Sequence, residues 1–135
     1  MIDVDYFKKY NDYYGHLKGD EVLQRLVQVI QQVLPKQGYL ARYGGEEFAI
    51  LLHDMPIEEA RETFEIVLLA VRAEQLAHDN RGDDKDYVTV SIGVAYMDAH
   101  HPYADIHTLM KTADQHLYEA KLAGRDQIKS KAVAA

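Results

Sequence analysis

Acidic residues at two distant places in the chain are the first candidates for chemistry. Asp3 ends a short apolar stretch, and Glu46 and Glu47 come directly after the Gly44-Gly45 pair. Carboxylates that share one site repel each other unless a cation lies among them. Mg²⁺ is the cation that such oxygen ligands favour, and it usually keeps phosphate as a further ligand. These three acids are therefore candidates for a magnesium site, provided that the fold brings them together.

Two basic residues near the other end of the chain are candidates for binding phosphate. Lys121 and Arg125 are four residues apart, at the end of the last helix that the apolar pattern predicts. From there both side chains could reach a phosphate tail on the same side as the acids. Acids that hold a metal, together with bases that hold polyphosphate, form the arrangement used for phosphoryl and nucleotidyl transfer.

The apolar periodicity predicts the elements that must bring these residues together. Strands are expected at residues 1–4, 39–43, 47–52 and 87–96, with a short last strand at 127–129. Helices are expected at residues 6–15, from 19 or 20 to 34, 56–71 and 105–123. This order is the βαββαβ pattern of an α+β, ferredoxin-like or palm-like sheet, with an extra C-terminal helix. In such a sheet the first strand runs antiparallel to the third, so Asp3 should meet Glu46 and Glu47 at one rim.

Length and composition restrict the class of protein. The chain has 135 residues, a net charge of −7 and no cysteine. The length suits a single domain, and the lack of cysteine excludes disulfide scaffolds, thiol catalysis and zinc–cysteine sites. The negative charge argues against a nucleic-acid partner, because duplex-binding surfaces need clustered Lys and Arg.

The expected location follows from what the sequence lacks. No apolar run approaches the ~20 residues that span a membrane, and the start has none of the features of a secretion signal. We therefore expect a cytoplasmic protein with no direct membrane contact from this segment, although the full-length protein could be membrane-tethered. The first residues resemble the end of a buried strand with no element before it, which suggests a fragment of a longer chain.

Each candidate residue also has a purely structural interpretation. The acids after Gly44-Gly45 could be solvated at an exposed hairpin turn. Asp20 is suited to an N-cap, and Asn11 could cap the end of the short helix before it. Lys121 and Arg125 could complement a helix C-terminus. The functional interpretation therefore depends on the combination of these residues.

Short segments that match a known family occur in order along the chain. They are Asp3-Val4-Asp5-Tyr6-Phe7-Lys8, Asn11-Asp12, Gly15-His16, Gly19-Asp20, Arg42-Tyr43-Gly44-Gly45-Glu46-Glu47-Phe48, Val90-Ser91-Ile92-Gly93-Val94, Ala113-Asp114, Tyr118-x-Ala120-Lys121 and Gly124-Arg125-Asp126. This combination resembles the GGDEF domain family, the diguanylate cyclases, with its signature hairpin in the Glu variant. The resemblance implies that residues 1–129 form a GGDEF catalytic domain without its N-terminal helix. Residues 130–135, at the chain terminus, are expected to form a frayed tail.

The resemblance implies an enzyme of bacterial second-messenger signalling. Members of the family condense two GTP into cyclic di-GMP and release pyrophosphate, through attack by the 3′-oxygen of one GTP on the α-phosphorus of the other. Asp3, Glu46 and the backbone carbonyl of Val4 should hold Mg²⁺, with Mn²⁺ as a substitute. Glu47 should lie at the same metal cluster or help to activate the 3′-hydroxyl.

The resemblance also implies which residues contact the substrate. Asn11 and Asp20 should hydrogen-bond the guanine edge, since a carboxylate can accept from the N1 and N2 donors that adenine lacks. The phosphates should be held at four positions, namely the backbone around Phe7 and Lys8 and the side chains of Lys121 and Arg125.

The resemblance also implies binding partners for the domain, and the chain differs from the family pattern at two places. Because the product is symmetric, two domains must face each other, so catalysis should need a homodimer. A sensory or receiver domain should lie upstream in the full-length chain, whereas the family's earlier Asp-x-Leu-Thr segment is missing here. The family's inhibitory Arg-x-x-Asp motif is replaced by Pro35-Lys36-Gln37-Gly38, so product inhibition through that site is not expected.

Two other functions are compatible with the same sequence. One alternative is a catalytically weak or inactive GTP-binding or effector domain of the same fold. The other is a structural dimerisation module with an acidic loop. Mg²⁺-dependent binding of GTP but not ATP separates the first two functions from the third. Formation of cyclic di-GMP separates the enzyme from the effector domain.

Overall fold

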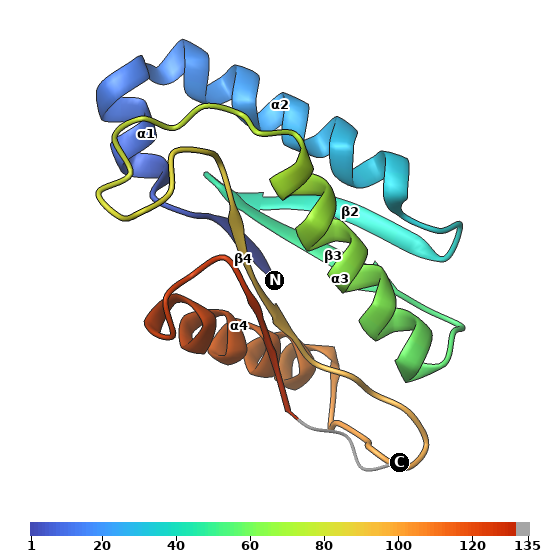
Figure 1. Ribbon diagram of the computed structural model, residues 1–135. Coiled ribbons are helices and arrows are strands. Elements are labelled where there is room, and N and C mark those ends of the chain that lie inside the picture. The colour runs from blue at the N-terminus through green and yellow to red at the C-terminus, as the bar shows by residue number, and fades with distance from the viewer. Residues whose placement is uncertain (132–135) are drawn as a thin grey trace.

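A computed structural model of the chain describes residues 1–131 (Figure 1). In chain order its elements are β1 (Ile2–Val4), α1 (Phe7–Tyr14), α2 (His16–Val33), β2 (Gly38–Gly44), β3 (Glu47–Leu52), α3 (Ile57–Ala73), β4 (Val90–Val94), α4 (Ile106–Leu122) and β5 (Ile128–Ser130).

The strands form one five-stranded sheet in the order β2-β3-β1-β4-β5. The short strand β1 lies in the middle and pairs antiparallel with β3 on one side and β4 on the other. All three of its residues are buried, as expected for a central strand. β5 adds at the edge, parallel to β4. The predicted α+β sheet with βαββαβ order and an extra C-terminal helix is therefore confirmed.

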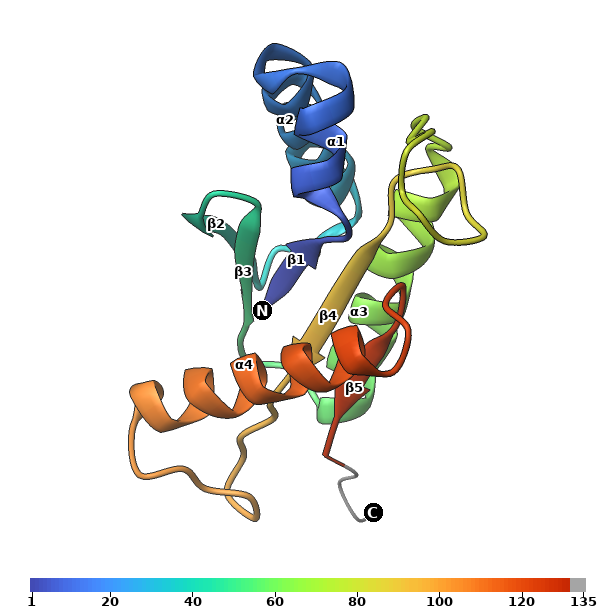
Figure 2. The same cartoon turned by 90° about the vertical axis from the view of Figure 1, so that its left-hand side faces the viewer.

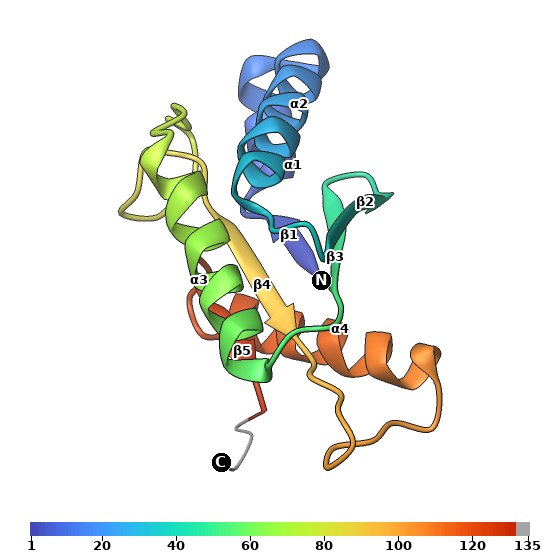
Figure 3. The ribbon, with the colours of Figure 1, turned by 90° about the vertical axis from the view of Figure 1, so that its right-hand side faces the viewer.

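Helices cover both faces of the sheet (Figures 2 and 3). α2 and α3 pack against each other, and α3 lies against the face of β4 that carries Val90, Ile92 and Val94. α4 crosses the opposite face of β4, where Ser91 and Gly93 lie, because successive strand residues point to opposite faces. None of the helices in residues 1–131 is both long and apolar enough to cross a membrane.

The start of α2 differs from the prediction. The helix begins at His16, earlier than the predicted residue 19 or 20, directly after Gly15 with a φ of 92°. Asp20 therefore lies inside the helix, and its interpretation as an N-cap is wrong. At the end of α1 the backbone carbonyl of Asn11, rather than its side chain, accepts from the Gly15 N–H at 2.8 Å.

Two strand boundaries also differ. β4 covers residues 90–94 rather than 87–96, because Tyr87 forms only an isolated bridge with Ala77 and its carbonyl accepts from Arg81 Nη1 at 2.8 Å. β5 ends at Ser130, so this residue belongs to the sheet and not to a tail. Residues 132–135 of the predicted tail lie outside the described residues.

Gly93 allows α4 to lie directly on β4. A Cβ atom at this position would be 2.0 Å from the Leu117 backbone nitrogen and 2.2 Å from the Ala113 carbonyl oxygen. These are backbone atoms of α4, so they cannot move away as a flexible side chain can. The approach fixes the distance between the sheet and the helix that carries Lys121.

We expect Gly93→Ala to lower the free energy of unfolding by about 3 kcal/mol, at the upper end of the cost of overpacking a core. Urea denaturation followed by circular dichroism measures this loss. Gly44→Ala is the matched control, because a Cβ atom at Gly44 would meet no atom within 4 Å. Equal stability of the two variants would contradict the close packing of α4 on β4.

Candidate active site

The sheet brings the candidate acids to one rim. Asp3 is the register partner of Glu47 across β1 and β3, and the Val4 N–H donates to the Glu46 carbonyl oxygen at 3.3 Å. Asp3 is buried, whereas Glu46 and Glu47 are half-buried at the turn of the β2–β3 hairpin. Residues more than forty positions apart in the sequence therefore meet as the predicted topology requires.

Lys121 forms an ion pair with Asp3 across the site. Its Nζ donates to Asp3 Oδ2, so the end of α4 is joined to the end of β1. Burial raises the pKa of Asp3 above its ordinary value, against the opposing effect of Lys121, and the negative charges of Glu46 and Glu47 raise it further. One ammonium thus faces three carboxylates, so this rim has an excess of negative charge.

The chemistry of these groups fits a hard divalent cation. The carboxylates of Asp3, Glu46 and Glu47 and the carbonyl of Val4 offer only oxygen donors, which Mg²⁺ prefers. Within residues 1–131, however, no three His, Asp or Glu side chains are arranged as a group that could hold a metal ion. The Asp3 carboxylate binds Lys121 instead, and the metal role of these residues stays a prediction.

The expected guanine contacts lie where α1 meets α2. Asn11 Oδ1 is buried and has no hydrogen-bond partner among the described residues. It lies against Gly19, where a Cβ atom would be 1.8 Å away, so only glycine leaves room for this amide. Asp20 is the next residue, exposed on α2. A buried amide oxygen without a partner is a group that a ligand can satisfy.

The expected phosphate contacts have different surroundings. Phe7 is buried in the core at the start of α1, and Lys8 is exposed. Arg125 lies beyond the end of α4 at a φ of 64°, so it does not share a helical face with Lys121. Its Nη1 donates a long hydrogen bond of 3.4 Å to the Tyr6 hydroxyl.

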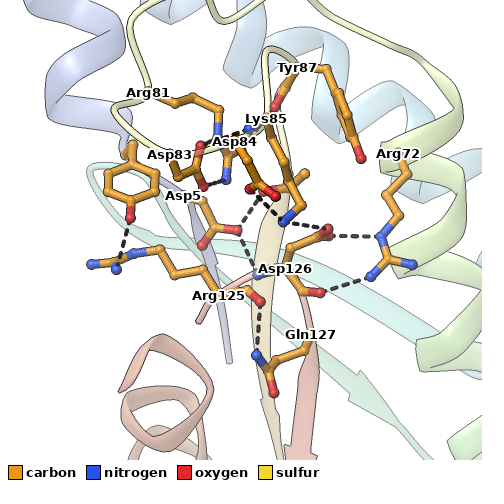
Figure 4. A network of polar contacts seen from close by, with 12 residues as sticks. Asp5, Arg72, Arg81, Asp83, Asp84, Lys85, Tyr87, Arg125, Asp126 and Gln127 are labelled. Carbon is orange, nitrogen blue, oxygen red and sulfur yellow. Dashed lines mark hydrogen bonds and ion pairs between the residues drawn. The ribbon is translucent and has the colours of Figure 1, made fainter. Parts of the chain in front are cut away.

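A buried network around Asp5 was not found from the sequence (Figure 4). The Asp5 carboxylate accepts from Thr89 Oγ1 at 2.6 Å, Ser91 Oγ at 2.6 Å and the Asp126 N–H at 3.0 Å. Arg72 on α3 donates in turn to the Asp126 side chain and carbonyl, both at 2.8 Å. The network joins β1, β4, α3 and the turn after α4. One sequence signal for it is the polar pair Thr89 and Ser91 within the otherwise apolar stretch that predicts a strand at residues 87–96.

Arg81 extends this network into the core. Its side chain is fully buried and makes a two-pronged ion pair with Asp83 at 2.9 and 3.0 Å. Its Nη1 also donates to Thr89 Oγ1 at 2.7 Å, and this hydroxyl donates to Asp5. The chain of hydrogen bonds therefore runs from a guanidinium through a hydroxyl to a carboxylate.

His78 is a further buried group, and no pattern in the sequence singles it out. Its Nε2 donates to the Tyr6 carbonyl oxygen at 3.0 Å, since a carbonyl can only accept. Its Nδ1 is buried without a partner among residues 1–131. Burial lowers the pKa of His78 below the ordinary imidazole value, so the ring is neutral at pH 7.

Comparison with known protein families gives one match over nearly the entire chain. Residues 1–127 match the family described as diguanylate cyclase, GGDEF domain. Diguanylate cyclase A of Treponema denticola is 35% identical over 128 residues, which cover 95% of this chain and 33% of that protein. The chain thus spans about a third of the length of this curated relative.

Solved structures agree with the sequence comparison. The active GGEEF domain of a diguanylate cyclase from Vibrio cholerae has a TM-score of 0.83 and 32% identity, over 98% of this chain and 81% of that one. The GGDEF domain of DgcB from Caulobacter crescentus, in complex with c-di-GMP, has a TM-score of 0.81 and 33% identity. That match covers 96% of this chain and 74% of the other.

We expect Asp5→Asn to lower the free energy of unfolding by about 2–4 kcal/mol, because an amide cannot accept all three hydrogen bonds and leaves buried donors unpaired. Urea denaturation measures the change. Asp84→Asn is the control, since the Asp84 side chain is 91% exposed. A loss no larger than that of the control would show that the Asp5 network does not stabilise the fold.

We also expect stability to fall as the pH drops from about 7.5 to about 5.5. The unfolded chain protonates His78 near the ordinary value of about 6.5, whereas the folded protein keeps this ring neutral to lower pH, so acid favours unfolding. His78→Gln keeps a donor and does not titrate, so its pH slope should be shallower. His107→Gln, at an exposed position, is the control. Equal slopes for wild type and His78→Gln would contradict the buried neutral ring.

Proposed function

The chain belongs to the diguanylate cyclase GGDEF domain family, and from this premise we propose that it condenses two GTP into cyclic di-GMP with release of two pyrophosphates. The observation that carries the proposal is the meeting of Asp3 with Glu46 and Glu47, opposite Lys121. The bond that forms joins the 3′-oxygen of one GTP to the α-phosphorus of the other. The bond that breaks releases pyrophosphate from the same phosphorus.

Asp3, Glu46 and the carbonyl of Val4 are the groups that would hold Mg²⁺, or Mn²⁺ in its place. The bound ion supplies charge neutralisation at the phosphates and lowers the pKa of the attacking hydroxyl. Glu47 lies at the same rim, where it either adds to the ligand set or accepts the proton of the 3′-hydroxyl. Lys121 then has a second role, because its ammonium can leave Asp3 and bind a phosphate oxygen.

Asn11 and Asp20 would distinguish guanine from adenine. The amide oxygen of Asn11 has no partner among the described residues, so a base N–H that reaches it satisfies a buried group. The carboxylate of Asp20 accepts hydrogen bonds from neighbouring N–H groups of guanine, and adenine would leave it unpaired. A site built to make such bonds rejects the analogue that lacks them.

The triphosphate would lie between the start of α1 and the end of α4. The first N–H groups of a helix have no partner within the helix and attract anions, which suits the backbone at Phe7 and Lys8. Lys121 and Arg125 approach from α4 and the turn beyond it. The positive charges would then lie beside the most negative part of the substrate.

The symmetry of cyclic di-GMP suggests that two copies of the domain act together. Each domain would bind one GTP, so a homodimer with two antiparallel substrates is the catalytic unit. The curated relative is about three times as long as this chain, which leaves room for an upstream sensory or receiver domain. Because GTP is found in the cytoplasm, we expect the reaction to take place there. A membrane tether, if the full-length protein has one, would belong to another segment.

We expect the protein to form cyclic di-GMP from GTP only when Mg²⁺ or Mn²⁺ is present, as measured by chromatography of the products. Asp3→Asn and Glu46→Gln should each lower turnover at least about a hundredfold, since metal-ion charge stabilisation amounts to several kcal/mol. Asp3→Asn should melt no lower than wild type, because burial already disfavours the carboxylate, as its raised pKa indicates. Glu62→Gln, exposed on α3, is the control.

Two results would contradict the proposal. If Asp3→Asn turned over GTP at the wild-type rate, the Asp3 carboxylate would have no role in the reaction. Mg²⁺-dependent binding of GTP with no cyclic product, in wild type at high protein concentration, would favour the effector-domain alternative.

A further inference from the structure

Tyr6 is held in a backbone conformation that few side chains adopt. Its φ of 53° and ψ of 37° lie in the left-handed region, at the residue that precedes α1. A bulky residue occupies this region only when its surroundings enforce it. Here the Tyr6 carbonyl oxygen accepts from His78 Nε2 and from the Tyr10 N–H, both at 3.0 Å. The backbone is therefore fixed from the core side.

The Tyr6 ring is surrounded by cations. The Arg125 guanidinium carbon lies 4.4 Å from the ring centre, and Arg81 and Lys9 Nζ each lie 5.2 Å from it. These distances are in the range of cation–π attraction, and the Tyr6 hydroxyl also accepts from Arg125. Three positive groups thus lie within cation–π range of one aromatic ring, next to the proposed triphosphate site.

Arg81 and Arg125 differ in how their charges are balanced. Arg81 is fully buried and forms an ion pair with Asp83, so its charge is neutralised within the fold. Arg125 is half-buried and forms no ion pair with any acid among residues 1–131. Of the two guanidiniums, only that of Arg125 is available to an anion.

The backbone of Arg125 is fixed independently of the ring. Its N–H donates to the Ala120 carbonyl at 2.9 Å, and the N–H of the next residue, Asp126, donates to Asp5. The side chain then extends from this fixed turn to Tyr6. Both ends of Arg125 are therefore held, which reduces the entropy lost when it binds an anion.

We propose that Tyr6 is a positioning residue, whose ring holds the Arg125 guanidinium in place for the polyphosphate of the substrate. This inference deepens the proposed function and rests on it for the identity of the substrate, but not for the anion site itself. The ring sets the direction of Arg125, and the anion supplies the negatively charged partner that Arg125 lacks among residues 1–131.

The test measures the binding of inorganic tripolyphosphate, a GTP analogue that cannot react, and GMP. We expect Tyr6→Leu to weaken binding of tripolyphosphate and the analogue about tenfold, the size of a partly desolvated cation–π contact. Binding of GMP should stay within about twofold, since it lacks the β- and γ-phosphates. Tyr6→Phe keeps the ring and should restore most of the affinity. Tyr39→Leu, at an exposed tyrosine on β2, should match wild type.

A double-variant cycle separates positioning from general damage. If Tyr6 acts through Arg125, then Tyr6→Leu combined with Arg125→Ala should bind tripolyphosphate no more weakly than Arg125→Ala alone. Additive losses, or wild-type binding by Tyr6→Leu, would overturn the inference. If Tyr6→Leu does not fold, the Arg125 Hε resonance of the wild type decides the matter. A ring-shifted resonance that moves with tripolyphosphate supports positioning, and an unshifted resonance overturns it.

The same measurements separate the two proposals. Binding of tripolyphosphate with the expected pattern, but without affinity for the GTP analogue, would refute the proposed function and leave the role of Tyr6 intact. Normal binding of the GTP analogue by Tyr6→Leu would refute the role of Tyr6 and leave the proposed function intact.

Discussion

The buried carboxylate of Asp5 is the contact on which the arrangement of the site depends. It accepts from Thr89, 84 residues away, and from the backbone of Asp126, 121 residues away. Asp126 directly follows Arg125, so this side chain ties the turn beyond α4 to the end of β1. A buried charge is tolerated here because three donors bind it. Together with the close packing of α4 on β4 at Gly93, this contact places Lys121 next to Asp3.

The acids at the neighbouring rim of the sheet are less well compensated than Asp5. Asp5 is well supplied with donors, whereas Asp3, two residues earlier, has Lys121 as its one side-chain donor among the described residues and faces Glu46 and Glu47. Burial without enough compensation raises the pKa of Asp3 and makes its charged form costly. A fold selected for stability alone would not keep three acids at this place. Such local cost is typical of sites that bind a cation or react.

Much of this arrangement could be predicted from the sequence, and the parts that could not share a physical cause. The order of strands and helices follows from local apolar periodicity, and the pairing of Asp3 with Glu47 follows from that order. The start of α2 was misplaced because Gly15 breaks the backbone without ending the polar, helix-compatible pattern around it. The short extent of β4 and the network of Asp5 depend on contacts with Arg81 and on donors far away in sequence. No local pattern records such contacts, because each is specified only once the sheet has formed.

Arg81 and Arg125 show how the fold distinguishes a charge that stabilises the structure from a charge that is free to bind an anion. Both lie near the Tyr6 ring. The sequence predicts a role only for Arg125, through its spacing from Lys121, and gives no sign that Arg81 is buried in an ion pair. Arg81 is enclosed with Asp83 and two further acceptors, so its charge is used to hold the loop before β4 against the core. Arg125 has a ring, a hydroxyl and a fixed backbone, but no acid in residues 1–131. A guanidinium with its geometry determined and its charge unbalanced is a binding group, since an anion then gains the ion pair without the cost of ordering the side chain.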